Sequence, residues 1–299
     1  MHTPVLLKEV IEALDFNEKD KVFLDATMGA GGHSLEVCRR FPWIKIIGID
    51  VDSEAAEIGR SNLLACGCQF DIKVSNFRHL AKVLEEEGIE KIDNGLFDLG
   101  MSSMQLAQSG RGFSFQKNEP ILMTMKKDIK EGDLTAYEIL RSWPKDSIEK
   151  ILREYGEESF AGRIAEGIVK ERKQGPINTT FDLVRVIENS TPRFYHHRRI
   201  HPATKTFQAL RIAVNDEINS LKEGLVQAFD KLNVGGRIAT ISFHSLEDRE
   251  VKVFFRELAR QEKAILPFKK PLRPSFEETK INPKSRSSKL RVVQKILKI

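Results

Sequence analysis

A glycine-rich turn after a short apolar segment is the strongest chemical signal in this chain. The run Val22–Leu24 reads as a buried strand that ends at Asp25, and Gly29-Ala30-Gly31-Gly32-His33-Ser34 follows. Glycines permit a tight turn and a close approach of backbone to ligand, and Ser34 is expected to cap a helix through Arg40. The pattern is typical of nucleotide-type sites, although glycine-rich turns also occur for purely structural reasons.

The carboxylate at the strand end separates the possible ligand classes. A dinucleotide fingerprint needs a third glycine where this chain has Ser34, and Asp25 would repel a pyrophosphate. A ligand with a cationic amino acid head and free ribose hydroxyls would be attracted, and S-adenosylmethionine fits that description. Asp50 and Asp98 also end predicted strands, and Asp50 has the spacing of a ribose-binding acid. We expect the three carboxylates to share one polar ligand.

Alternating strands and helices must position these residues. Apolar segments predict strands over 44–50, 70–74 and 95–98, with helices over 54–64 and about 78–87 between them. This rhythm is typical of an α/β fold with a mostly parallel sheet, covered by helices on both faces, that binds ligands at the carboxyl ends of its strands.

The alternation stops between about residues 116 and 200, where four helices are predicted in succession, over 133–141, 145–155, 160–172 and 180–190. The α/β pattern then resumes. Its predicted elements are a helix over 205–232, a turn over 233–236, a strand over 237–243, a helix over 247–260 and an edge strand over 290–297. We therefore expect a Rossmann-like domain of residues 1–115 and 201–299, interrupted by an all-helical insertion domain of residues 116–200.

Charge is distributed unevenly along the chain. Residues 1–110 hold 11 Lys and Arg against 18 Asp and Glu, a net charge of −7, whereas residues 260–299 hold 12 against 3, a net charge of +9. The basic end and a second basic cluster with aromatic residues over 193–199 favour a nucleic acid partner over a merely solvated surface. Charged residues make up 30% of the chain, above the usual quarter, a proportion more common in heat-adapted proteins.

Other function classes have less support. No apolar run approaches the roughly 20 residues of a membrane span, and the start lacks a signal peptide's pattern, so we expect a cytoplasmic protein. Cys38, Cys66 and Cys68 lack C-x-x-C spacing, so buried free thiols are expected instead of disulfides or a zinc site.

A metal site is also disfavoured. His196, His197 and His201 lie among cations and lack a fourth ligand. Neither a G-x-S-x-G elbow nor a phosphate-binding loop motif is present.

Eight ordered segments together resemble one family, the ribosomal RNA small subunit methyltransferase H family (RsmH/MraW). They are His2–Leu7, Asp25–Ser34, Asp98–Ser103, Arg111–Phe115, Tyr155–Glu158, His201–Ile212, Ser242–Arg249 and Asn282–Ser288. Members transfer a methyl group from S-adenosylmethionine to the exocyclic N4 of a cytidine in the decoding centre of bacterial small-subunit (16S) rRNA, and their Rossmann-like methyltransferase domain is interrupted by a helical domain. The resemblance implies that this chain has the same activity and uses the same cofactor. It also implies that the partner is small-subunit rRNA or the assembled small subunit, that no membrane is involved, and that the protein is a monomer or a homodimer.

The resemblance also implies the cofactor contacts Gly31, Gly32, His33, Asp50, Phe77, Asp98 and Gln105. Phe77 follows a strand and could stack on adenine, although a phenylalanine in a loop is more often a minor core residue. Gln105 offers both a donor and an acceptor, and the alternative is an exposed helical residue. Asp98, Ser102 and Ser103 are the residues that we expect to orient the target nitrogen or accept its proton.

RNA contacts are expected from residues near strand ends and helix starts. They are Arg111, Phe113, His201, Lys205, Arg211, Phe243, His244 and Arg249. Phe113 or Phe243 would stack on a flipped or unpaired cytosine. Some of the charged residues are equally consistent with buried ion pairs.

One segment departs from the family pattern. Where the family has Pro-Leu-Asp-Met-Arg-Met-Asp, this chain has Leu122, Thr124 and Lys126 at the three polar positions, so we place no site residue there. Two other functions stay open: an N-methyltransferase acting on another nucleic acid, and a non-catalytic ribosome assembly factor that binds S-adenosylmethionine. A nicotinamide dehydrogenase is disfavoured by Asp25.

Overall fold

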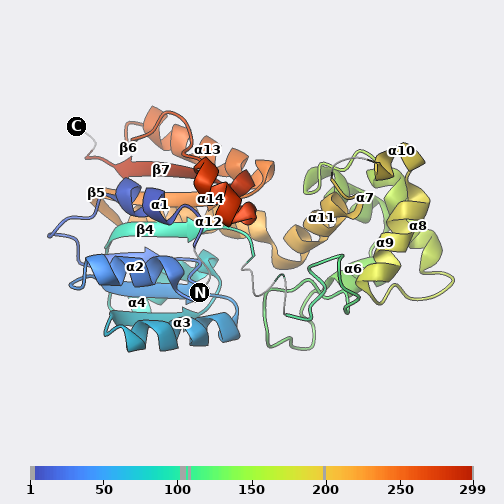
Figure 1. The fold of residues 1–299 in the computed structure, drawn as a ribbon, viewed down its shortest axis with the longest axis horizontal. Helices are drawn as coiled ribbons and strands as arrows, with labels where there is room; N and C mark the ends of the chain where they lie inside the picture. Colours follow the sequence, from blue (N-terminus) through green and yellow to red (C-terminus); the bar gives the residue numbers. More distant parts are fainter. Residues whose placement is uncertain (1–3, 102–105, 107–108, 198–199, 298–299) are drawn as a thin grey trace. The chain divides into compact units, whose positions relative to one another are not determined.

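The structure, a computed structural model, describes residues 4–101, 106, 109–197 and 200–297. The chain divides into two compact units, which Figure 1 shows in sequence colours. We call Met1–Gly100 with Ile218–Ile299 the sheet unit and Met101–Glu217 the helical unit.

Seven strands of the sheet unit form one sheet in the order β3-β2-β1-β4-β5-β7-β6. They are β1 Val22–Asp25, β2 Lys45–Asp50, β3 Gln69–Val74, β4 Ile92–Asp98, β5 Leu232–Ser242, β6 Ala264–Ile265 and β7 Lys289–Lys295. The first five strands in that order run parallel, while β7 is antiparallel to both β5 and β6. This arrangement confirms the predicted mostly parallel, Rossmann-like sheet.

Helices pack on both faces of the sheet. The sheet unit contains α1 Leu7–Leu14, α2 Gly32–Arg40, α3 Ser53–Ala65, η1 Phe77–His79, α4 Leu80–Glu86, α12 Glu217–Lys231, α13 Ser245–Arg260, α14 Phe276–Ile281 and η2 Pro283–Ser287. Apolar residues of α1, α2 and α3 join one buried cluster, and those of α4, α12 and α13 join another. Adjacent strand residues alternate between the clusters, with Phe23 in the first and Leu24 in the second, because successive side chains of a strand point to opposite faces.

Two predictions about the end of the sheet unit are wrong. β7 is an inner strand, because β6, only two residues long, covers its outer side. Residues 233–236 lie within β5, where its register against β4 is irregular and Gly235 has a φ of +88°. A bulge and a turn both favour glycine, so the sequence did not separate them.

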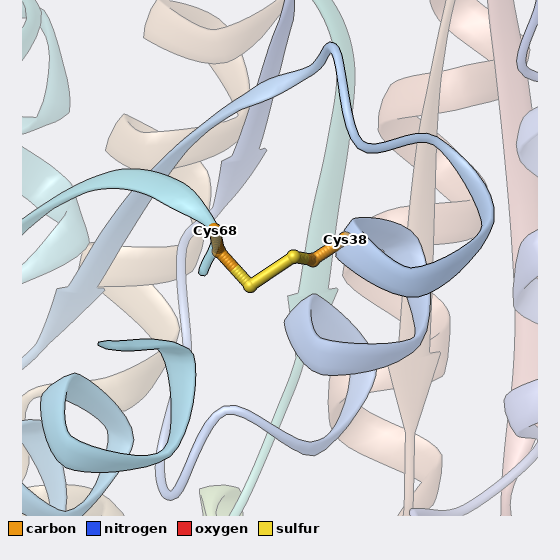
Figure 2. The surroundings of a disulfide bond; sticks show 2 residues. All are labelled: Cys38 and Cys68. Carbon is orange, nitrogen blue, oxygen red and sulfur yellow. A yellow bond between two sulfur atoms is a disulfide. The ribbon is translucent and has the colours of Figure 1, made fainter. Parts of the chain in front are cut away.

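Cys38 and Cys68 form a disulfide, which overturns the prediction of free thiols (Figure 2). Their Cα atoms are 5.7 Å apart although 30 positions separate them in the sequence. The bond joins α2 to the residue before β3. The fold brings the two cysteines together, and no spacing motif in the sequence indicates this pairing. Cys66 is free and exposed.

The helical unit consists of α6 Ala136–Ser142, α7 Lys145–Glu154, α8 Ala161–Glu171, α9 Thr180–Ser190, α10 Arg193–His196 and α11 Ala203–Asn215 around a third apolar cluster. The four successive helices predicted here are confirmed. The single helix predicted over 205–232 is wrong: α11 ends before Asp216, whose φ of 47° and ψ of 43° are left-handed. Aspartate tolerates that conformation, and the apolar periodicity continues past it, so the sequence shows no break.

Within the described residues, no helix is long and apolar enough to cross a membrane.

Candidate functional site

Three carboxylates end adjacent parallel strands. In the pairing of β1 with its neighbours, Asp25 lies opposite Gly48 of β2 and Leu96 of β4. Asp50 and Asp98 end those neighbours two residues later. Because paired strands lie about 4.8 Å apart, the three side chains gather at the carboxyl edge of the sheet, which we call the acidic edge.

Asp25 is buried and takes part in the local fold. Its Oδ2 accepts a hydrogen bond from Ser34 Oγ at 2.7 Å, and its Oδ1 accepts one from the Thr27 amide at 3.4 Å. Burial raises the pKa of Asp25 to about 6, although the Ser34 bond opposes the rise. The prediction that Ser34 caps α2 is therefore wrong, since the N-cap is Gly31 and Ser34 binds the strand-end acid instead.

Asp50 fixes the glycine turn. Its Oδ2 accepts a hydrogen bond from the Gly29 amide at 2.7 Å, and its Oδ1 accepts one from the Asp52 amide at 2.9 Å. Burial raises the pKa of Asp50 to about 6, while these two bonds favour the charged form. A carboxylate has about four lone-pair sites, so Asp50 retains acceptor capacity for a ligand hydroxyl.

Glycine is required in the turn for packing. Gly31 has a φ of +80°, and a Cβ there would lie 3.2 Å from Met28 Cε. A Cβ on Gly32 would lie 2.5 Å from Pro4 Cγ. A Cβ on Gly48 would overlap Met28 Sδ. The Met28 side chain therefore occupies the space beneath the turn, and Gly32 is needed for contact with Pro4.

Asp98 has an unsatisfied oxygen. Its Oδ1 is buried and accepts no hydrogen bond from any described residue. Burial, followed by repulsion from Asp25 and Glu247, raises the pKa of Asp98 well above its usual value. An unpaired buried acceptor is costly, so this oxygen is suited to a donor that a ligand brings.

His33 lies next to Asp98. Its Nε2 is 3.0 Å from the carbonyl of Val5, which can only accept, so Nε2 carries the proton and Nδ1 is the acceptor. Nδ1 is 3.8 Å from Asp98 Oδ2. Burial lowers the pKa of His33 to about 4, so at neutral pH the ring adds no positive charge to the acidic edge.

Phe77 follows β3 and packs partly into the sheet unit. Its ring meets Phe97 edge-on at 5.6 Å, and a Cβ on Gly224 would lie 2.7 Å from Phe77 Cδ2. The side chain is half-buried, so part of the ring is accessible. The predicted residues Ser102, Ser103 and Gln105 lie outside the described residues.

A polar group at the end of β5 adds a residue that the sequence analysis missed. Glu247 is 2% exposed; its Oε2 accepts from the Phe243 amide at 3.0 Å, and its Oε1 is 3.1 Å from His244 Nε2. His244 caps α13 through Nδ1, which accepts from the Glu247 amide at 3.4 Å. The three-residue spacing from His244 to Glu247 is that of a capping box and could have indicated this pair. Phe243 is half-buried and Arg249 is exposed.

The expected RNA contacts of the helical unit divide into buried and exposed residues. Arg111 is buried and donates to the Met125 carbonyl at 2.7 Å. Phe113 is 6% exposed and belongs to the apolar cluster of this unit. His201 is exposed, and its ring stacks on Phe115 with centroids 4.4 Å apart.

Two further cations of this unit have internal partners. Arg211 makes two hydrogen bonds of 2.8 Å to the Glu217 carboxylate, and Lys205 Nζ donates to the Glu157 carbonyl at 2.6 Å. In the segment that departs from the family pattern, Leu122 is half-buried, Thr124 is buried, and Lys126 pairs with Asp133 at 2.6 Å.

Comparison with known proteins relates the chain to one family. Residues 1–296 match the MraW methylase family. A protein of Heliobacterium mobile named ribosomal RNA small subunit methyltransferase H is 45% identical over 312 residues, with 99% of each chain covered. A protein of the same name from Persephonella marina is 43% identical over 295 residues, again with 99% of each covered. A solved rRNA methylase from Streptococcus thermophilus aligns over 99% of both chains with a TM-score of 0.44 at 12% identity.

Proposed function

The chain belongs to the MraW methylase family, and from that premise we propose that it methylates the exocyclic N4 of a cytidine in the decoding centre of bacterial small-subunit rRNA. The relatives' name, ribosomal RNA small subunit methyltransferase H, supports small-subunit rRNA as the substrate. The observation that carries the chemistry is the buried, unsatisfied Asp98 Oδ1 at the acidic edge. The alternative is a protein of the same family that binds the cofactor during ribosome assembly without catalysis.

S-adenosylmethionine is the cofactor of this methylase, and it supplies an electrophilic methyl group when bound. The acidic edge fits such a ligand. Asp50 would accept from the ribose hydroxyls with its remaining lone pairs, and the glycine turn up to Gly31 allows close backbone approach. We propose that Phe77 covers the adenine and that His33 and Gln105 complete the contacts, with Gly32 acting through the turn.

The protein's own task is to orient the target nitrogen and remove its proton. We propose that Asp98 accepts a hydrogen bond from the exocyclic amine, which directs the nitrogen lone pair toward the methyl group. Its raised pKa makes the Asp98 carboxylate a better proton acceptor than an exposed aspartate. We propose that Ser102 and Ser103, which follow Asp98 in the sequence, assist it.

The target cytidine must be unpaired or flipped, because its N4 otherwise takes part in base pairing. Phe243 is the stacking partner that we favour, since Phe113 lies in the core of the helical unit. We propose that the exposed His201 and Arg249 contact the RNA, and that Lys205 and His244 support them. The small subunit or its rRNA would then meet this protein in the cytoplasm.

Methyl transfer to isolated small subunits tests this proposal. Subunits from cells with and without the gene are incubated with purified protein and labelled cofactor, and the modified nucleotide is mapped by mass spectrometry. We expect one N4-methylated cytidine in the decoding centre, formed only in subunits from cells without the gene. Asp98→Asn should abolish transfer while leaving the fold intact.

Two results would contradict the proposal. Methylation of a different atom or of another nucleic acid would refute the proposed substrate. Tight cofactor binding without turnover on any assembly intermediate would instead favour the non-catalytic assembly factor.

A further inference from the structure

The stretch between β6 and β7 is rich in basic side chains. Among the described residues, no carboxylate lies within ion-pair distance of any of six basic side chains, which are Lys269, Lys270, Arg273, Lys280, Lys284 and Arg286. By contrast, the next two cations on the chain, Lys289 and Arg291, bind Asp248 at 2.8 Å and 2.7 Å. The excess charge of the basic end is therefore concentrated before β7.

A hollow of about 430 Å³ lies in this stretch. Its lining residues are Phe276, Thr279, Lys280, Pro283 and Arg286. The Phe276 side chain is 79% exposed, although burying such a ring is usually favourable. A flat apolar ring beside two cations matches the chemistry of a nucleotide, whose base stacks on aromatic rings and whose phosphate binds cations. The volume lies within the range of about 300–1,000 Å³ that is typical of small-molecule sites.

The walls of the hollow are held by hydrogen bonds. Ser275 caps α14 by accepting from the Glu278 amide at 3.0 Å, and Glu278 Oε1 accepts from the Leu6 amide at 2.9 Å. Ser285 of η2 and Ser288, which follows η2, are fully buried, and their hydroxyls donate to the carbonyls of Asn282 and Ser285 respectively. Lys284 and Arg286, on either side of the buried Ser285, are both exposed.

The hollow precedes a strand that begins at the acidic edge. Lys289, the first residue of β7, pairs with Ser242 at the end of β5, and Ile241 of β5 pairs with Asp98. Two strand spacings of about 4.8 Å separate β7 from β4, and Figure 1 shows α14 at the end of the sheet toward which β4 points. An RNA strand that placed a cytidine at Asp98 would therefore pass close to α14 and η2.

We propose that this hollow binds one nucleotide of a single-stranded RNA segment next to the target cytidine, an inference that rests on the proposed function. The Phe276 ring stacks on the base, and Lys280 and Arg286 bind an adjacent phosphate. The hollow is thus a second contact for the RNA, outside the reaction centre, that selects unpaired RNA over a duplex because only unpaired bases can stack on the ring.

Three variants separate stacking from charge. Phe276→Ala removes the ring, and Lys280→Glu with Arg286→Glu reverses two charges. Lys19→Glu with Lys91→Glu is the matched control. These exposed lysines precede the amino ends of β1 and β4, opposite the acidic edge, and their reversal gives the same change in net charge. Binding of a short, labelled, single-stranded oligoribonucleotide is measured by fluorescence anisotropy across a salt series, and product-cofactor binding is measured by calorimetry as a check of the fold.

We expect Phe276→Ala to weaken oligonucleotide binding roughly 5- to 100-fold with an unchanged salt dependence. The charge reversal should weaken binding at least about tenfold and reduce the salt slope by about 0.7, since the one phosphate contact that is lost contributes about 0.7 for single strands. The control pair should stay near wild type, and a duplex of the same sequence should be insensitive to Phe276→Ala.

Wild-type affinity in both test variants would overturn the inference. Equal losses in the test and control charge variants, with none for Phe276→Ala, would also overturn it, because the contact would then be general attraction of polyanions. If the wild-type protein transferred no methyl group to small subunits, the proposed function would fail, while the oligonucleotide comparison would still decide whether the hollow binds RNA.

Discussion

The disulfide between Cys38 and Cys68 gives the most quantitative prediction. The double variant Cys38→Ala with Cys68→Ala removes a cross-link that closes a loop of 30 residues. In the chain-entropy description, a loop of that length restricts the unfolded chain by about 12 cal/mol/K, which is about 3.6 kcal/mol at 25 °C. Because Cys38 is also buried in the first apolar cluster, its truncation adds to the loss. We therefore expect the free energy of unfolding to fall by at least about 3 kcal/mol.

The two tryptophans of the chain allow the sheet unit to be followed separately. Trp43 lies between α2 and β2 in the sheet unit, and Trp143 lies in the helical unit. In a Trp143→Phe background, guanidinium unfolding is monitored by Trp43 fluorescence alone. With a slope of about 4 kcal/mol/M, the midpoint should fall by roughly 0.9 M.

Two controls isolate the cross-link. Cys66→Ala changes an exposed, free thiol and should leave the midpoint unchanged. A phosphine reductant should lower the midpoint of the wild-type protein but not that of the double variant. A double variant within 1 kcal/mol of wild type, or a wild-type protein insensitive to the reductant, would refute the reasoning.

Three further predictions concern the acidic edge. Asp50→Asn should weaken product-cofactor binding, measured by calorimetry, roughly 10- to 100-fold, because a charged acceptor is lost. The affinity of the wild type should also fall as the pH drops through about 6, where Asp50 gains a proton, and the affinity of the variant should not show that change. Burial raises the pKa of Asp25 from 3.8 to about 6, so the folded state holds this proton more tightly than the unfolded state does. The free energy of unfolding of the wild type therefore declines as the pH rises from 4 to 6. Chemical unfolding should therefore show Asp25→Asn gaining stability relative to wild type across that window, by up to about 3 kcal/mol, and a constant difference would contradict the raised pKa. Gly31→Ala should lose about 1–2 kcal/mol through its positive φ and should also weaken cofactor binding, whereas Gly88→Ala, at a φ of +67° with open space around it, should lose stability alone.

The sheet was predictable because its strands are buried on both faces. Each of β1, β2 and β4 has an apolar segment directly before its final aspartate, over 22–24, 46–49 and 95–97. Parallel strands bring their carboxyl ends to one edge. This geometry placed Asp25, Asp50 and Asp98 together without any knowledge of side-chain contacts. The helices were predictable from their apolar periodicity for the same reason, that burial dictates pattern.

Features that depend on contacts between distant residues could not be predicted. The Cys38–Cys68 bond depends on where α2 ends relative to β3, and the inner position of β7 depends on the two-residue strand β6. At the site, Ser34 could cap a helix or bind Asp25, and both uses suit a serine near a helix start. Only the three-dimensional structure distinguishes the two, through the 2.7 Å bond to Asp25.

The sequence also could not separate the expected RNA contacts from residues that pack in the core. Arginine and phenylalanine suit both RNA binding and packing, and nothing in the sequence around Arg111 and Phe113 separates these two uses. The exposed fraction separates them: Arg111 and Phe113 are buried, whereas Phe276 is 79% exposed beside Lys280 and Arg286. An exposed ring next to positive charge is free to stack on a base whose phosphate binds the cations. For that reason we assign the second RNA contact to α14 and η2, on a ring that the sequence analysis did not single out.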